Sequence, residues 1–308
     1  MYLDQIQHKK KSKSYETISG LAMSSLPVIG FVIFALIPMI IAIYLAFCSI
    51  EKLDISSATW NNFENFSYVF NDKKFWSSGL NTIIFTISLP ICMVISLGVS
   101  FLLTKKIKGK KVFRTIFFIP YVCSVVAVAL MWSYIFNPRH GVVNSVLGVD
   151  STNIPVQFNW LGEPNAFRTM IIIMSVWGGC GYQIILYTAA LTNINPTLYE
   201  AAKIDGANAW QCFRNITLPG VSPTTFYLFI TGLIGSLQSF AALHAINPNG
   251  SNPASLTIGF YLYNYMGFNP GYQRNMGVAS AAALILSVFI VIITIIQFKG
   301  SRKWVNYD

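Results

Sequence analysis

The sequence predicts an all-α integral membrane protein that crosses the bilayer six times and keeps both termini in the cytoplasm. Apolar residues make up 54% of the chain and charged residues only 10%, whereas soluble domains carry about 25% charged residues. The apolar residues gather in long charge-free stretches, and basic residues gather between alternate stretches. A water-soluble surface cannot be built from this composition. The chain is therefore divided into membrane-spanning segments and not into soluble domains.

Six stretches are long enough to span a membrane, since a helix needs about 20 apolar residues to cross a hydrocarbon core about 30 Å thick. In lipid every backbone amide must be paired internally, and the lack of period-two alternation favours helices over a barrel. The weakest is the third stretch, for which a buried core helix is the alternative. The predicted spans are residues 17–50, 75–104, 115–138, 169–195, 219–246 and 275–298.

The distribution of basic residues predicts the orientation. Of the 21 lysines and arginines, the segments assigned to the outside hold only Lys52, Lys73, Lys74, Arg139, Arg168 and Arg274. Because basic residues favour the cytoplasmic side, both termini are expected there. Residues 1–16 then form a cytoplasmic basic tail and residues 17–308 one transmembrane domain. Anionic lipid headgroups account for these basic residues, so no nucleic-acid partner is predicted.

Several kinds of chemistry are missing from the sequence. The spans carry no Asp, Glu, Lys or Arg away from their ends, although ion-coupled carriers usually place one there. No GxxxxGK[ST] loop for binding nucleotide phosphates is present. The five cysteines form no CxxC pair, and no metal site or catalytic set can be assembled around the scattered histidines His8, His140 and His244. We therefore expect no enzyme, and the driving force must come from elsewhere.

The cytoplasmic loop 196–218 has its own local architecture. Asn195-Pro196 is typical of a helix start, and Asp205-Gly206 offers the left-handed turn that ends a helix. A second short helix is predicted from Ala207 to about Asn215, with Pro219 ending it before the fifth span. On that helix one face collects Ala209, Trp210, Phe213 and Ile216. Such a helix either fits a groove in a partner protein or rests on lipid.

This loop carries a family resemblance. The residues that carry it are Glu200, Ala201, Ala202, Asp205, Gly206, Ala207, Phe213, Ile216, Leu218 and Pro219. They resemble the EAA loop of binding-protein-dependent ABC importer permeases. The resemblance implies a type I ABC importer permease fold, in which this loop forms the coupling helix that docks into an ATPase subunit.

The same resemblance implies the partners. They are a second homologous permease subunit, two nucleotide-binding ATPase subunits and an extracellular or periplasmic solute-binding protein. ATP and Mg are expected on the ATPase subunits, and no cofactor is expected on this chain.

A second stretch resembles the sugar permeases of this family. Residues 117–148 read FFIPYVCSVVAVALMWSYIFNPRHGVVNSVLG, with Asn137-Pro138, Gly141 and Asn144 in positions typical of that subgroup. The similarity extends over nearly the whole chain, to the type that includes the larger maltose permease subunit. After the fifth span the chain reads AINPNGSNPAS, where the subgroup often has Thr-x-Gly-Gly-Pro. A carbohydrate substrate is therefore expected.

Neutral polar and aromatic side chains in the fourth and fifth spans are candidates for the substrate path, because sugars present hydroxyl groups and apolar ring faces. They are Ser175, Trp177, Gly179, Tyr182, Gln183, Ser236, Gln238, Ser239 and Phe240. The resemblance supports Gly179, Tyr182, Ser236 and Ser239 as lining residues. The alternative is that Ser and Gln join neighbouring helices by hydrogen bonds, as the close glycines Gly178, Gly179 and Gly181 do by packing.

The predicted function is half of the translocation path of an ATP-driven importer for a sugar or oligosaccharide. The chain would lie in the bacterial cytoplasmic membrane and work by alternating access. Other polar solutes, such as a polyamine, an amino acid or phosphate, remain alternatives within the same family. A channel or a structural subunit without an ATPase partner is the alternative from another class.

Overall fold

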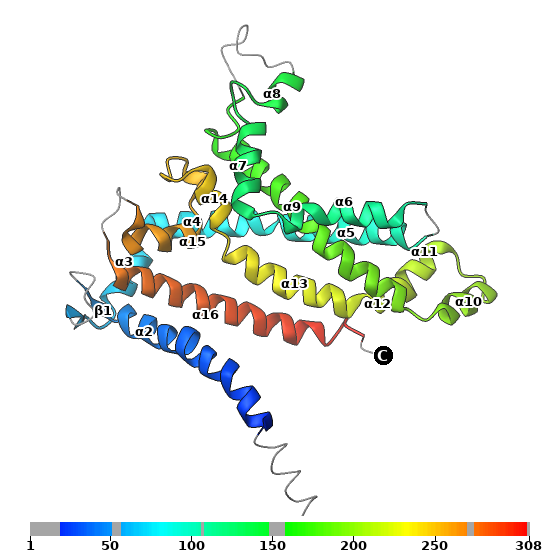
Figure 1. Cartoon of the computed structure of the whole chain (residues 1–308), viewed down its shortest axis with the longest axis horizontal. Helices are drawn as coiled ribbons and strands as arrows, with labels where there is room; N and C mark the ends of the chain where they lie inside the picture. The colour runs from blue at the N-terminus through cyan, green and yellow to red at the C-terminus, as the bar shows by residue number, and fades with distance from the viewer. Residues whose placement is uncertain (1–18, 51–56, 106–107, 148–157, 270–273, 307–308) are drawn as a thin grey trace, which may run out of the picture.

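The computed structural model describes residues 19–50, 57–105, 108–147, 158–269 and 274–306. The basic tail 1–16 and the first two residues of the predicted first span lie outside these ranges. Long helices run side by side along the molecule, with β1, α3 and α15 at one end and α10 and α11 at the other (Figure 1).

Four of the predicted spans are confirmed as helices long and apolar enough to cross a membrane. The first contains a π-helical turn, η1 (Val32–Leu36), followed by α2 (Ile37–Ala46). The second contains α4 (Lys73–Thr86) and α5 (Ser88–Thr104), separated only by Ile87. Among the described residues these helices are Ser19–Ala46, Lys73–Thr104, α9 (Pro164–Asn193) and α16 (Met276–Ser301).

The third span is not the single helix predicted over residues 115–138. It consists of α6 (Lys110–Val122) and α7 (Val125–Ile135), which meet at 96°. Cys123 and Ser124 between them have extended backbone angles. Pro120 in the last turn of α6 removes one backbone donor, which weakens the helix just before the bend.

The fifth span, predicted over residues 219–246, also differs from the structure at both ends. Pro219 does not end the preceding helix, which continues to Gly220 and bends by 59° into α13 (Ser222–Leu237). The bend follows from Pro223, which has no N–H for the Pro219 carbonyl; the Ser222 hydroxyl donates to that oxygen instead, at 2.7 Å. At the other end α13 stops at Leu237, and α14 (Ala241–Ile246) is a separate helix.

The chain is not strictly all-α, because a two-residue ribbon follows the first span. β1 (Cys48–Ser49) pairs antiparallel with β2 (Thr59–Trp60). Asn65 donates from Nδ2 to the Ala46 and Cys48 carbonyls at 3.0 and 2.9 Å, which satisfies backbone acceptors where the first helix ends. The other short elements outside the spans and the loop 196–218 are α3 (Glu64–Asn71), α8 (Val142–Val146), η4 (Pro253–Ser255), α15 (Ile258–Tyr263) and η5 (Asn264–Phe268).

Helix α9 packs between α5 and α6. Ser96 and Ser100 of α5 donate to the Cys180 and Ile184 carbonyls at 3.4 and 3.0 Å. On the α6 side, a Cβ at Gly181 would collide with the Phe117 carbonyl oxygen, so only glycine permits this approach. The close packing predicted for the glycines is thus confirmed at Gly181, whereas a Cβ at Gly178 would meet nothing within 4 Å.

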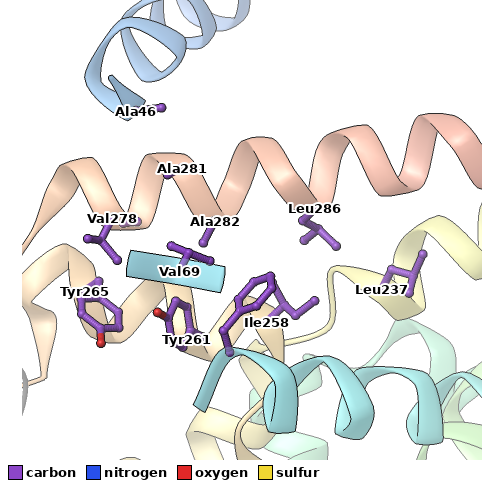
Figure 2. Packing of buried hydrophobic residues seen from close by; sticks show 12 residues of the cluster. Ala46, Val69, Leu237, Ile258, Tyr261, Tyr265, Val278, Ala281, Ala282 and Leu286 are labelled. Carbon is purple, nitrogen blue, oxygen red and sulfur yellow. The ribbon is translucent and has the colours of Figure 1, made fainter. Parts of the chain in front are cut away.

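A second core joins the end of the first helix to α16, the last helix (Figure 2). Small residues of α16, among them Ala281 and Ala282, are fully buried beside Ala46 and Val69. They let the end of the first helix and α3 approach α16 closely, as small residues commonly do between membrane helices.

Beside this core, the Asp72 carboxylate joins α15 and η5 to the start of α4. It accepts hydrogen bonds from the Tyr261 and Tyr265 hydroxyls at 2.9 and 3.2 Å. Burial raises the pKa of Tyr261 and of Tyr265 well above the usual value, so both hydroxyls keep their protons and donate. The hydrogen bonds of Asp72 therefore fix α15 and η5, which lie between α14 and α16, to the start of α4.

The outward faces of the helices are apolar. Phe34 is 82% exposed, Val94 73% and Ile296 62%. Contiguous apolar surface on this scale is unusual in a soluble protein, and in lipid it is the expected surface of a spanning helix. The chain is a membrane protein.

Candidate functional site

The predicted first helix of the loop is confirmed. α10 (Pro196–Ile204) begins after Asn195, whose Oδ1 accepts the Thr197 N–H at 3.0 Å. Pro196 occupies the first turn, where its missing N–H leaves no carbonyl unpaired.

The turn after α10 explains the spacing of the loop motif. Gly206 has a φ of +77°, a left-handed conformation that favours glycine. The Ala207 N–H donates to the Ala202 carbonyl at 2.8 Å, and the Gly206 N–H donates to the Lys203 carbonyl at 3.1 Å. These two bonds form a Schellman motif. Ala202, Gly206 and Ala207 thus form the C-terminal cap of α10, and this cap sets the direction in which the chain continues.

The second helix of the loop begins at Ala209, two residues later than predicted. Asn208 and Gln211 form a capping box: the Asn208 Oδ1 accepts the Gln211 N–H at 2.9 Å, and the Gln211 Oε1 accepts the Asn208 N–H at 2.7 Å. The helix runs through α11 (Ala209–Cys212), η3 (Phe213–Thr217) and α12 (Leu218–Gly220). We call residues 195–220, with both loop helices, the coupling knob.

One ring contact fixes the coupling knob to a membrane helix, and one hydrogen bond joins its two helices to each other. The Phe213 ring meets Phe101 of α5 edge-on at 5.9 Å. The Tyr199 and Thr217 hydroxyls are 2.9 Å apart, which joins α10 to the second helix. Phe213 and Ile216 pack inward and are half-buried, but Trp210, predicted on the same face, is 66% exposed. Within the knob, Phe213 is the residue that packs on α5.

The rest of the motif faces outward. Glu200, Ala201 and Asp205 are exposed, and in the described part of the chain neither carboxylate has a hydrogen-bond or ion-pair partner. Leu218 is 38% exposed, whereas Pro219 is half-buried. Sequence reasoning missed Ile204, which is 87% exposed beside the glycine turn. An apolar residue directly before Asp-Gly was the available signal.

Between the knob and the spans lies a cleft of about 740 Å³. Leu198 and Ile216 line its knob side, and Asn193 and Thr224 line its membrane side. The knob thus stands out from the helix ends and is not folded flat against them.

The kink of the third span borders a second cleft, of about 320 Å³, which we call the kink cleft. Ser175 and Gly179 of α9 line it, and Ser239 reaches it from beyond α13. Gly178 lines it as well, which explains the open space at that glycine. Three predicted path residues from two different spans therefore come together here.

Tyr182 lies next to the kink cleft in a row of three tyrosines. Its ring stacks on Tyr121 at 5.1 Å with 17° between the planes, and its hydroxyl lies 3.2 Å from that of Tyr227. Tyr121 lines the cleft and is 49% exposed. It was not among the predicted residues, since its place depends on the bend at Cys123, which the sequence did not reveal.

The other predicted path residues lie apart from the kink cleft. Trp177 packs on Trp132 at 5.8 Å between centroids. Ser236 donates to Thr86 Oγ1 at 3.1 Å, which is the interhelical bond offered as the alternative. Gln183 is buried, with an Oε1 that has no hydrogen-bond partner among the described residues. The remaining two are Gln238, which is exposed, and Phe240, which packs on His244 and Tyr263.

Known proteins are similar to this chain in sequence and in fold. Residues 94–304 match the family described as the binding-protein-dependent transport system inner membrane component. The probable ABC transporter permease protein YesP of Bacillus subtilis is 32% identical over 307 residues, covering 97% of this chain and 96% of YesP. The lactose transport system permease protein LacF of Rhizobium radiobacter is 32% identical, covering 78% of this chain and 80% of LacF.

A solved structure agrees with these relatives. A chain of the bacterial alginate ABC transporter, in complex with its alginate pentasaccharide-bound periplasmic protein, superposes with a TM-score of 0.77 at 27% identity. The match covers 94% of this chain and 96% of that one. The chain therefore belongs to the family of binding-protein-dependent transport system inner membrane components, the permease subunits of ABC transporters.

Proposed function

We propose that this chain forms half of the translocation path of an ATP-driven importer that carries a carbohydrate. The observation that carries the proposal is the coupling knob. It displays two unpaired carboxylates and an exposed Ile204 at one end of the molecule, and it is held to α5 by the Phe213 contact with Phe101. A rigid surface of this kind suits a partner protein whose conformational change is transmitted through the knob to the membrane helices.

The topology that we propose has six crossings, with each bent pair counted as one span. The first helix begins, and α16 ends, on the knob side. The first helix ends near the start of α16, at Ala46 and Val278 in one core, so its amino end lies toward the knob. At the other terminus, the Asn306 N–H donates to the Ser222 hydroxyl at the start of α13, at 2.9 Å. The basic loops support the same orientation.

The partners that we propose at the knob are two ATPase subunits, which bind ATP and Mg. The docking residues are the motif positions Glu200, Ala201, Ala202, Asp205, Gly206, Ala207, Phe213, Leu218 and Pro219. Of these, Gly206 and Ala207 define the direction of the knob, and Glu200 and Asp205 offer negative charge to the partner. Closure of the ATPase subunits would move the knob, and with it α5 and the tightly packed α9.

A carbohydrate is the substrate class that the kink cleft fits. Ser175 and Ser239 can bond sugar hydroxyls, and the Tyr121 face suits an apolar ring face. No Asp, Glu, Lys or Arg lines this cleft, which favours a neutral solute. LacF is named as a lactose permease and the structural relative as an importer of alginate, an acidic polysaccharide; both names support a carbohydrate, and the lining of the cleft is what favours a neutral one.

Two further partners complete the proposal. A second permease subunit would close the kink cleft, which is open in this chain alone, into a path. A solute-binding protein would deliver the sugar at the end opposite the knob, as the periplasmic protein in the alginate complex suggests. The two permeases would alternate between outward and inward openings.

The test is purification through a tag on this chain, followed by reconstitution in liposomes with the subunits that co-purify. We expect ATPase subunits among them, and ATP-dependent uptake of a neutral di- or oligosaccharide when the binding protein is added. A panel of radiolabelled neutral sugars, uronides, amino acids and polyamines identifies the class. Absence of an ATPase, or uptake restricted to amino acids or polyamines, would contradict the proposal.

A further inference from the structure

Two cysteines from different spans meet in the core of the bundle. Cys92 belongs to α5 and Cys180 to α9, and their Sγ atoms are 3.4 Å apart. Both side chains are buried, with exposed fractions of 3% and 7%. All five cysteines belong to the described residues, and each carries a free thiol. Neither the loop motif nor the lining of the kink cleft accounts for this pair.

The geometry of the pair suits a disulfide. The S–S bond of a disulfide is about 2.05 Å long, so the two sulfurs need to approach by about 1.4 Å. Each sulfur already reaches the backbone of the opposite helix. Cys92 Sγ is 3.8 Å from the Val176 carbonyl oxygen, and Cys180 Sγ is 3.9 Å from the Cys92 carbonyl oxygen. The two side chains therefore point toward one another, and small rotations about χ1 close the gap.

A series of polar contacts already fixes the register between these helices, and we call it the α5–α9 ladder. Three residues of α5, four positions apart, each approach a carbonyl oxygen of α9 that lies 84 residues further along the chain. The pairs are Cys92 with Val176, Ser96 with Cys180 and Ser100 with Ile184, at 3.8, 3.4 and 3.0 Å. Because the offset is constant, the two helices run parallel and keep one register over about two turns.

The α5–α9 ladder lies between the coupling knob and the kink cleft. Phe101 of α5, next to the last contact of the ladder, packs on Phe213 of the knob. Ser175 and Gly179 of α9 line the kink cleft. A disulfide between Cys92 and Cys180 would join the two helices at a level where the ladder already holds them. It would therefore leave their register unchanged.

Gly179 brings the thiol pair close to the kink cleft. It lines that cleft, and a Cβ built on it would be 3.3 Å from Cys92 Sγ. The same residue is thus part of the cleft wall and of the surroundings of the thiol. A small uncharged oxidant in the cleft would come within one residue of the pair.

We propose that Cys92 and Cys180 are a redox-sensitive pair, which a small membrane-permeant azo oxidant joins into a disulfide between α5 and α9. One sulfur adds to a nitrogen of the N=N double bond. The other sulfur then attacks the first, which forms the S–S bond and breaks the S–N bond. Both protons and both electrons pass to the two nitrogens, which leave as a hydrazine. The second step is favoured because its two reactants are already held together.

The disulfide leaves transport intact, because it joins two helices that move together. This second part rests on the proposed function, whereas the formation of the disulfide does not.

The experiment uses the intact transporter with its co-purifying subunits, in membranes treated with the azo oxidant diamide. The chain keeps Cys92 and Cys180, and alanine replaces Cys48, Cys123 and Cys212. Free thiols are blocked with N-ethylmaleimide, and the digested chain is analysed by mass spectrometry. We expect one linked pair of peptides, containing Cys92 and Cys180, that dithiothreitol separates. The wild type, treated in the same way, should give the same linked pair, so the result does not depend on the folding of the variant.

A chain that keeps only Cys92 and Cys212 is the matched control. Cys212 directly precedes Phe213, which packs on Phe101, and the nine residues from Cys92 to Phe101 rise about 13 Å along α5. This chain should give no linked peptides.

Thermal unfolding in detergent gives a second readout of the disulfide. Oxidation of the chain with Cys92 and Cys180 should raise its Tm by about 5 °C or more, because the disulfide joins residues that are 88 positions apart and so constrains the unfolded chain. Cys180→Ser should abolish this rise.

Sugar uptake by the oxidised transporter tests the second part of the proposal. After oxidation and removal of diamide, the chain with Cys92 and Cys180 should retain most of the uptake of the reduced transporter. It should also hydrolyse the same amount of ATP for each sugar.

Either of two results would overturn the proposal. No linked peptides from the variant or the wild type, under conditions in which the exposed Cys123 of the wild type is modified, would show that the pair is not redox-sensitive. A disulfide that abolishes uptake, with recovery in dithiothreitol, would show that α5 and α9 move against one another during transport. Absence of uptake by the reduced transporter would instead contradict the proposed function, and the linked peptides would still report on the disulfide.

Discussion

Replacement of Gly206 tests the coupling knob through its backbone alone. The glycine has a φ of +77°, and a Cβ there would meet nothing within 4 Å. Alanine therefore adds no collision, and its whole penalty is the left-handed conformation, roughly 1–2 kcal/mol for a residue with a Cβ. Asparagine tolerates that conformation better, so it should be milder than alanine.

Proline at the same position is incompatible with the turn. Its φ is fixed near −65°, and it has no N–H for the bond of 3.1 Å to the Lys203 carbonyl. It also disfavours the helical backbone of the preceding Asp205, which has φ −74° and ψ 1°. The free-energy cost of losing both the left-handed backbone conformation and the Schellman hydrogen bonds exceeds about 3 kcal/mol. The second helix of the knob would then run in a different direction from α10.

The assay is ATP-dependent uptake, divided by the amount of chain in the membrane. We expect near-normal uptake for Gly206→Asn, a partial loss for Gly206→Ala and complete loss for Gly206→Pro. Membrane levels should not change, because position 206 is exposed and touches no span. Gly300→Ala is the matched control, with the same open space but no positive φ. Normal transport by the proline variant, or equal damage by alanine and proline, would refute the reasoning.

Three further changes give distinct readouts. Glu200→Lys should abolish uptake at unchanged membrane levels, whereas Glu64→Lys, at the other end of the molecule, should leave uptake intact. Gly181→Ala presses a methyl group onto the α6 backbone and should destabilise the protein by about 1–3 kcal/mol, seen as a lower Tm in detergent; Gly178→Ala, in open space, should keep the Tm. Tyr261→Phe should lose about 1.5–3 kcal/mol with its hydrogen bond to a carboxylate. The pKa of Tyr261 is raised in the native state, so above about pH 10 an unfolded Tyr261 loses its proton while the native one keeps it, and the unfolded state becomes favoured. The wild-type Tm should therefore fall above about pH 10, and it should fall less steeply in Tyr261→Phe, which lacks this group.

The spans were predictable because their signal is local. Charge-free runs of more than 20 residues leave no alternative to a helix in lipid, and Asn275, predicted as the start of the last span, caps α16 by accepting the Val278 N–H at 3.1 Å. The turn at Gly206 was equally local, since Asp-Gly is a helix stop on any surface.

The bends were not predictable from the same signal. Cys123 and Ser124 carry no charge, so the apolar run continues unbroken through a change of direction of 96°. Pro219 was expected to stop a helix and does not; Pro223, four residues later, removes the donor for its carbonyl, and the helix bends there. Pro219 and Pro223 each offer a position at which the helix could bend, and the sequence does not show which of the two is used.

The candidate path residues illustrate the same limit. Ser175 and Ser239 line a cleft, while Ser236 bonds Thr86 and acts between helices. Residue type cannot separate these roles, because both need a small hydroxyl on an apolar helix. Tyr121 entered the kink cleft only because the third span bends next to it.

The most direct measurement is a cysteine cross-link from the tip of the coupling knob. Ile204→Cys is introduced into a chain whose five native cysteines have been replaced, and the intact transporter is treated in membranes with a short bifunctional maleimide. We predict a cross-link to an ATPase subunit, and labelling by an impermeant maleimide only after the cytoplasmic side is opened. Labelling of residue 204 from outside intact cells, or protection of it by lipid with no cross-linked ATPase subunit, would contradict the role of the knob.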